Sequence, residues 1–107
     1  MKKKIEIEMK GDPRFHQLLE VMRDIHNRKS MDYSEESDPL SNFKLAEKIG
    51  VPPWKGVLIR MSDKFSRLCR LADKGKAEVK DETFADTLID LAVYALICRI
   101  LYEDKKI

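Results

Sequence analysis

The segment from Glu82 to Tyr102 most constrains the fold, because it is almost entirely apolar yet carries carboxylates at a spacing of four residues. Glu82, Asp86 and Asp90 return to nearly the same side of an α-helix, each ~6 Å further along its axis. Aliphatic side chains occupy most of the remaining positions, so we expect a central and largely buried helix. A buried carboxylate without a partner is costly, and these acids must therefore face a metal ion, a cationic side chain or water in a cleft.

Length and composition predict a single domain over residues 1–107, with 43% hydrophobic residues to form its core. The 21 basic and 19 acidic residues leave a net charge of +2, so direct binding to nucleic acid is not expected. Cys69 and Cys98 lack metal-ligand spacing and are expected to be reduced core residues. No signal sequence or membrane span is recognisable, which predicts a soluble, cytoplasmic protein with no membrane partner.

An alternating pattern at residues 4–9 predicts a short strand within an N-terminal strand or arm of residues 1–11. No second strand candidate follows, so this segment must pair with another copy of itself, rest on a helix or stay disordered. The final helix is also apolar around most of its circumference. Together these features predict a homodimer or a larger homo-oligomer.

Start and stop signals divide residues 12–104 into three long helices and one short helix. The expected helices are residues 13 to about 28, 39–48, 54–73 and 80 or 81–104, joined by a polar loop at 29–38 and a turn at 74–76. Asp12 and Asp38 are the predicted N-caps, each followed by proline, and Gly50 is the predicted stop of the short helix. The expected core faces carry Phe15, Leu18, Leu19, Met22 and Ile25; Leu40, Phe43, Leu45 and Ala46; and Val57, Met61, Phe65, Leu68 and Leu71. We therefore expect an all-α helical bundle.

The expected helix 54–73 carries a charged stripe. This stripe lies within reach of the acidic stripe, Glu82, Asp86 and Asp90, if the helices at 54–73 and 81–104 are antiparallel neighbours. Its members are Arg60, Asp63, Lys64 and Arg67. Two interpretations remain open at this point. The cations form interhelix salt bridges that neutralise the acids, or Asp63 joins an acidic cluster around magnesium or manganese while the cations bind phosphate.

Four segments resemble the all-α nucleoside triphosphate pyrophosphohydrolases, the MazG-like and dimeric dUTPase superfamily. They look most like a phage and bacterial group often labelled nucleotide-modification-associated. The segments are residues 29–33 (KSMDY), Asn42-Phe43, residues 54–68 (WKGVLIRMSDKFSRL) and residues 81–97 (DETFADTLIDLAVYALI). The DTLxDLAxYA run in the last segment is the most specific of these features.

The resemblance implies magnesium- or manganese-dependent hydrolysis of a (deoxy)nucleoside triphosphate to its monophosphate and pyrophosphate. It implies metal ligands at Asp63, Glu82, Asp86 and Asp90, of which Asp63 and Asp86 are also the candidate catalytic acids. It implies substrate contacts from Arg60, Lys64, Arg67, Lys29, Asp32 and Tyr33. Ser66 and Thr83 depart from the superfamily's pattern of acids, E-x-x-E followed by E-x-x-D. These departures leave a non-catalytic nucleotide-binding protein as one alternative. A helical interaction or regulatory module, in which internal salt bridges explain the acids, is the other.

Overall fold

The computed structural model describes residues 10–35, 37–73 and 81–104, apart from the side chains of residues 81 and 82. Its elements are α1 (Pro13–Tyr33), the 3-10 helix η1 (Ser41–Ile49), α2 (Pro53–Asp73) and α3 (Asp81–Asp104). Every regular element in this part of the chain is helical, which confirms the all-α prediction of three long helices and one short one. The predicted strand at 4–9 and the turn at 74–76 lie outside the described residues.

Cap hydrogen bonds define two of the predicted helix boundaries. The Asp12 carboxylate accepts a bond from the Arg14 backbone N–H at 2.8 Å and begins α1 as predicted. Gly50 ends η1 with φ of 81°, a left-handed conformation that costs glycine little. The helix before Gly50 is a 3-10 helix that begins two residues later than predicted. Asp38 accepts from the Leu40 N–H at 3.1 Å and holds the residues before η1 in a turn.

The end of α1 was predicted wrongly, and the error affects the functional site. The helix continues to Tyr33 instead of stopping near Arg28. Residues 29–33 contain neither glycine nor proline, so their polar character alone does not interrupt the helix. The helix ends at Ser34, which is extended and donates its backbone N–H to the Ser30 carbonyl at 3.1 Å.

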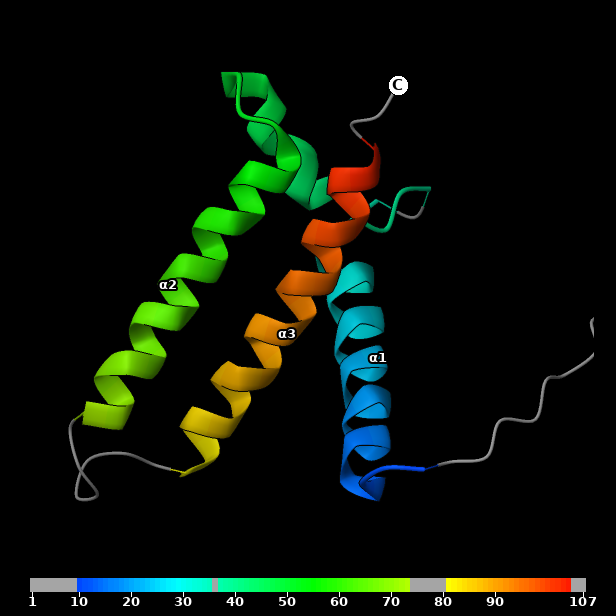
Figure 1. Cartoon of the computed structure of the whole chain (residues 1–107). Coiled ribbons are helices and arrows are strands. Elements are labelled where there is room, and N and C mark those ends of the chain that lie inside the picture. The colour runs from blue at the N-terminus through cyan, green and yellow to red at the C-terminus, as the bar shows by residue number, and fades with distance from the viewer. Residues whose placement is uncertain (1–9, 36, 74–80, 105–107) are drawn as a thin grey trace, which may run out of the picture.

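The core lies between α2 and α3, which run antiparallel and side by side as predicted (Figure 1). Val57 of α2 is fully buried and packs with Val93, Ile97 and Leu101 of α3. The buried Thr87 hydroxyl donates to the Thr83 carbonyl at 2.8 Å, so its burial leaves no unpaired group. This pairing positions the residues of α2 and α3 that face α1.

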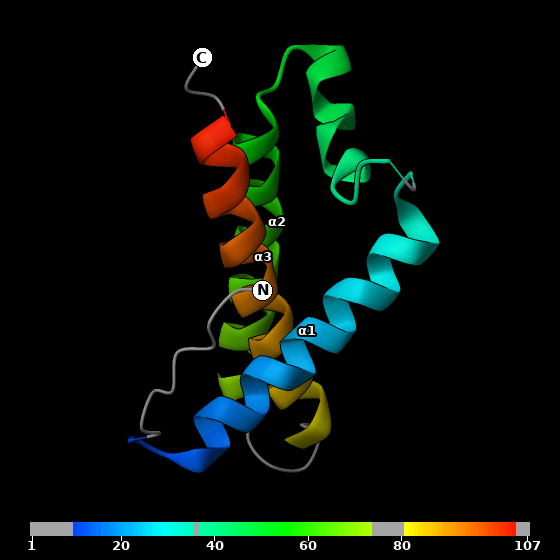
Figure 2. The same ribbon diagram turned by 90° about the vertical axis from the view of Figure 1, so that its right-hand side faces the viewer.

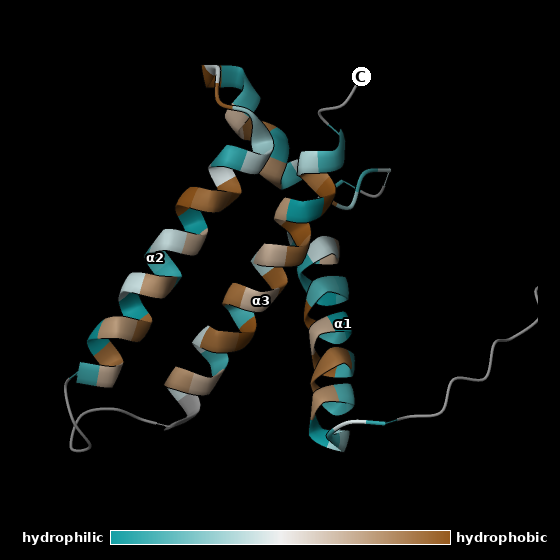
Figure 3. Cartoon of the chain, in the orientation of Figure 1, coloured by the Kyte–Doolittle hydropathy of each residue, from teal (hydrophilic) through white to brown (hydrophobic). Residues whose placement is uncertain are grey.

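Helix α1 packs more loosely, and part of the predicted core is exposed. Figure 2 shows α1 running diagonally past the α2–α3 pair, and it contains no buried residue among those described. Hydrophobic positions are spread along all three long helices (Figure 3). Those that remain exposed include Phe15, Leu18 and Leu19 of α1, Phe65 of α2, and Leu88, Leu96 and Ile100 of α3. The expectation that α3 is largely buried is thus wrong on one side of the helix, where the monomer offers no neighbour.

The described part of the chain has an open shape. The Cα radius of gyration is 16.6 Å, whereas a compact chain of this length has about 13 Å. Within the described residues, no helix combines the length and the apolarity of a membrane span.

Candidate functional site

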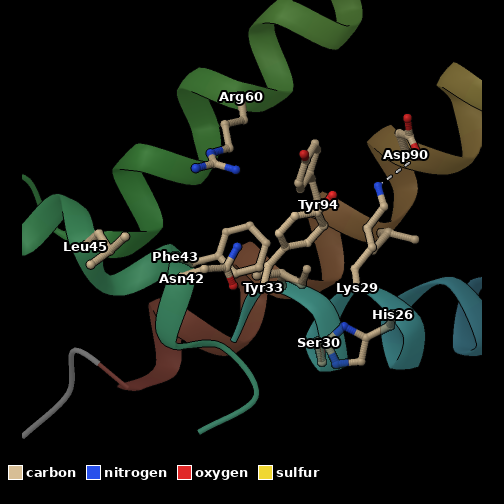
Figure 4. Close-up of a pocket in the computed structure, with 12 residues that line it drawn as sticks. His26, Lys29, Ser30, Tyr33, Asn42, Phe43, Leu45, Arg60, Asp90 and Tyr94 are labelled. Carbon is tan, nitrogen blue, oxygen red and sulfur yellow. Dashed lines mark ion pairs between the residues drawn. The ribbon is translucent and has the colours of Figure 1, made fainter. Parts of the chain in front are cut away.

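A recess of about 480 Å³ lies where all four helices meet (Figure 4). It combines aromatic rings, cationic side chains and one carboxylate. It is lined by His26, Lys29, Ser30 and Tyr33 of α1, by Asn42, Phe43 and Leu45 of η1, by Arg60 of α2, and by Asp90, Val93, Tyr94 and Ile97 of α3. Because α1 supplies four of these residues, the extension of α1 beyond residue 28 is what builds this wall.

The aromatic rings of Tyr33, Phe43 and Tyr94 all line the recess (Figure 4). Phe43 and Tyr94 meet edge to face, with centroids 6.1 Å apart and an interplanar angle of 82°. The Arg60 guanidinium lies over the Phe43 ring, 5.3 Å from its centroid. Tyr33 differs from both, because 68% of its surface is exposed. Its ring is therefore the one most available to a flat ligand.

Asp90 joins the three long helices through its carboxylate. It accepts a hydrogen bond from Lys64 of α2 at 3.3 Å and lies 3.8 Å from the Lys29 ammonium of α1. Its side chain is 26% exposed, so the charge is only partly hydrated. The sequence left three possible partners for the acids: a metal ion, a cationic side chain or water. Asp90 has cationic side chains as its partners. The contact with Lys64 confirms that the two predicted stripes reach one another at this position.

The other predicted site residues lie in two neighbouring grooves. Asp32 and Asp86 line a groove of about 470 Å³ between α1 and α3, which Lys29, Tyr33 and Asp90 also border. A second groove, of about 400 Å³, follows α2 and is lined by Arg60, Asp63, Lys64, Arg67, Arg70 and Tyr94. Asp63 and Asp86 are both exposed and lie in different grooves.

The metal site stays a prediction. Among the described side chains, no three histidine, cysteine, aspartate or glutamate residues converge closely enough to hold a metal ion. The fourth proposed ligand, Glu82, lies in α3, but its side chain is outside the described part of the structure. Asp90 forms ion pairs with two lysines, Lys29 and Lys64, as expected of an acid in a salt bridge. The described acids by themselves therefore do not form a protein-only cage for magnesium.

Several residues of the recess escaped the sequence analysis. Phe43 was assigned to the core and His26 to no site, whereas both line the recess. One sequence signal would have found part of this set. If the first helix is continued past residue 28, His26, Lys29 and Tyr33 fall on one side of it at spacings of three and four. Tyr94 carried no such signal, because its partners come from η1 and α2.

Comparison with known proteins gives no match. No protein-family model matches the chain, and neither a curated protein nor a solved structure is significantly similar to it. The superfamily resemblance therefore stays a prediction, and a function has to be argued from the recess itself.

Proposed function

We propose that this chain binds a nucleoside triphosphate in the recess between the four helices. The observation that supports this most directly is the meeting of an exposed aromatic ring, Tyr33, with the cations Lys29 and Arg60 on one concave surface. A nucleotide needs both features, a flat apolar surface for its base and positive charge for its phosphates. A volume of about 480 Å³ also suits a ligand of this size.

The arrangement of the side chains suggests how the ligand lies. The base would stack on Tyr33, where the ring is exposed, and the phosphates would point toward Arg60 and Lys29. Asn42 would hydrogen-bond the edge of the base, because its side-chain oxygen accepts from the Ser34 hydroxyl at 2.6 Å and the amide is thereby fixed at the wall. The phosphates would compete with Asp90 for Lys29, whose ammonium is 3.8 Å from that carboxylate.

Hydrolysis is the activity that the superfamily resemblance adds to this binding. It would be magnesium- or manganese-dependent and would release pyrophosphate and a nucleoside monophosphate. Magnesium commonly keeps several waters and uses one or two carboxylates together with substrate phosphates. We therefore expect the metal and the nucleotide together to stabilise the chain more than either alone. The alternative is a nucleotide-binding protein without hydrolysis, and measurement of released pyrophosphate separates the two.

The test is thermal unfolding with each deoxynucleoside triphosphate, with and without magnesium. A ligand at a hundredfold excess over its Kd stabilises the folded chain by ~2.7 kcal/mol, which is a visible shift in Tm. Tyr33→Ala should weaken binding by ~1–3 kcal/mol, the usual value of stacking a base on an aromatic side chain. Met31→Ala is the matched control, because Met31 is a neighbouring exposed residue outside the recess. If no nucleotide raises Tm in any condition, the proposal is wrong.

We also propose that the chain works as a homodimer. Leu88, Leu96 and Ile100 recur along one side of α3 and are exposed in the single chain. Exposed apolar side chains gathered on one side of a helix are typical of an interface. The open shape of the chain, described above, leaves room for a second copy beside α3.

Light scattering of matched variants tests the dimer. Leu96→Glu places a charge on the proposed interface at a residue that is 55% exposed, so the fold of the single chain should tolerate it. We expect this variant to be monomeric at micromolar concentration. Ile49→Glu is the control, at an even more exposed apolar residue of η1. A wild-type chain that is already monomeric, or a Leu96→Glu variant that still dimerises, would contradict the proposal.

A further inference from the structure

Besides the recess, the groove along α2 is a second surface suited to binding an anion. Four of its six lining residues are cationic, Arg60, Lys64, Arg67 and Arg70, and Asp63 is the one carboxylate among them. Their spacing of three or four residues places them on one side of the helix. The first and the last are ten positions apart, which is ~15 Å along the helix axis.

The groove continues the recess. Arg60 and Tyr94 line both of them, so a ligand that extends past Arg60 would reach the groove. The pairing of α2 with α3 creates this continuity, because it places Tyr94 of α3 beside Arg60 of α2. The two hollows are therefore neighbours, with aromatic residues in the recess and cations along the groove.

The cations of the groove differ in how far they are already neutralised. Lys64 donates to Asp90 at 3.3 Å, and Arg60 lies over Phe43. Arg67 and Arg70 are exposed and form no ion pair with any described residue. Among the described residues, therefore, Arg60 and Lys64 already have a partner, whereas no ion-pair partner is seen for Arg67 and Arg70.

We propose that this groove binds the outer phosphates of the nucleotide and makes the site select its ligand by phosphate number. The inference rests on the proposed function, because it needs the base in the recess to set the direction of the phosphate chain. The first phosphate then lies at Arg60 and Lys29, and each further phosphate meets another cation, first Lys64 and then Arg67. A monophosphate uses only the first of these contacts.

The experiment is calorimetric titration of the full chain with the mono-, di- and triphosphates of the four deoxynucleosides, in EDTA, so that only protein cations act. We expect Kd to fall about three- to tenfold with each added phosphate, the range of partly exposed charge-assisted contacts. Higher salt should weaken the triphosphate more than the monophosphate, since more charges are screened.

Two variants assign the effect to the groove. Arg67→Gln should weaken triphosphate binding by about three- to tenfold and leave monophosphate binding unchanged. Arg23→Gln, which removes an exposed α1 arginine paired with Glu20, should change neither. Circular dichroism and Tm of the free variants establish that both fold.

The outcomes separate this inference from the function on which it rests. If no nucleotide binds the wild-type chain, the proposed function fails and the groove assignment fails with it. If the monophosphate binds and the triphosphate binds no tighter, only the groove assignment is wrong. It is also wrong if Arg67→Gln weakens all three ligands equally. Tighter binding of a short single-stranded oligonucleotide than of any triphosphate would make the groove a nucleic-acid surface and overturn the inference.

Discussion

Replacing Asp90 with asparagine tests the electrostatic contact that ties the three long helices together. A unit charge pair at 3.3 Å is worth about 1 kcal/mol in water and about 5 kcal/mol at an effective dielectric of 20. Lys64 is 31% exposed and Lys29 is 53% exposed, so solvent screening keeps each pair near the lower value. Asparagine can still accept a hydrogen bond from Lys64. We therefore expect Asp90→Asn to lower the free energy of unfolding by about 1–2 kcal/mol.

Urea unfolding at pH 7 and one fixed protein concentration measures this loss, and Asp86→Asn is the matched control. Asp86 lies one turn away on the same helix, is exposed, and forms no ion pair with a described residue. Its substitution should change stability by less than about 0.5 kcal/mol. The difference between the two variants should shrink in 1 M salt, where exposed pairs are screened. Equal losses in both variants would refute the assignment of Asp90 as the acid that joins the helices.

Three further predictions follow from other parts of the structure. Burial raises the pKa of the Cys98 thiol, so a thiol reagent at neutral pH should label the exposed Cys69 well before Cys98; equal rates would show that Cys98 is not shielded. Hydrogen bonds from the Lys44 side chain and a backbone N–H lower the pKa of Asp38 below its ordinary 3.8. The stabilisation that the charged Asp38 carboxylate contributes is therefore present above about pH 4 and is lost as pH falls through the lowered pKa. Asp38→Asn should reduce the drop in Tm between pH 7 and pH 3, and an unchanged drop would disprove this contribution. Gly50→Ala should lower the free energy of unfolding by about 1–2 kcal/mol, because alanine is strained at φ of 81° although its Cβ would meet open space. Denaturant unfolding measures this loss, and an unchanged stability would show that the backbone relaxes there.

The helices were predictable from the sequence because their signals are local. Asp12 and Gly50 mark helix boundaries through their own chemistry, and the structure has caps at both. The antiparallel pairing of α2 and α3 was predictable as well, since a short connection leaves them little choice. The end of α1 was not, because polar residues 29–33 suit a loop and a helix almost equally, and neither glycine nor proline interrupts the helix there.

The residues of the candidate site were likewise predictable only where their signal was local. Lys29 and Tyr33 were named through the superfamily resemblance, and Arg60 also belonged to the charged stripe seen in the spacing of its helix. Phe43 and Tyr94 were not assigned to a site, because an aromatic residue in an apolar pattern has the same signal whether it fills a core or lines a recess. Which of the two applies depends on contacts between helices that are distant in sequence. The acids Asp63 and Asp86 line different grooves in the structure, so the metal site that the resemblance assigns to both of them stays a prediction.

The most direct test of nucleotide binding at the recess is an NMR titration of the 15N-labelled chain with a deoxynucleoside triphosphate. If the recess is the site, the largest amide shifts will occur at residues of the recess wall and will saturate together with one Kd. The residues to follow are Lys29, Tyr33, Asn42, Phe43, Arg60 and Tyr94. Amides at the N-terminal end of α1, near Phe15, should stay unchanged and serve as the internal reference. Absence of shifts with all four triphosphates, or shifts confined to residues outside the recess and the α2 groove, would contradict the proposed function.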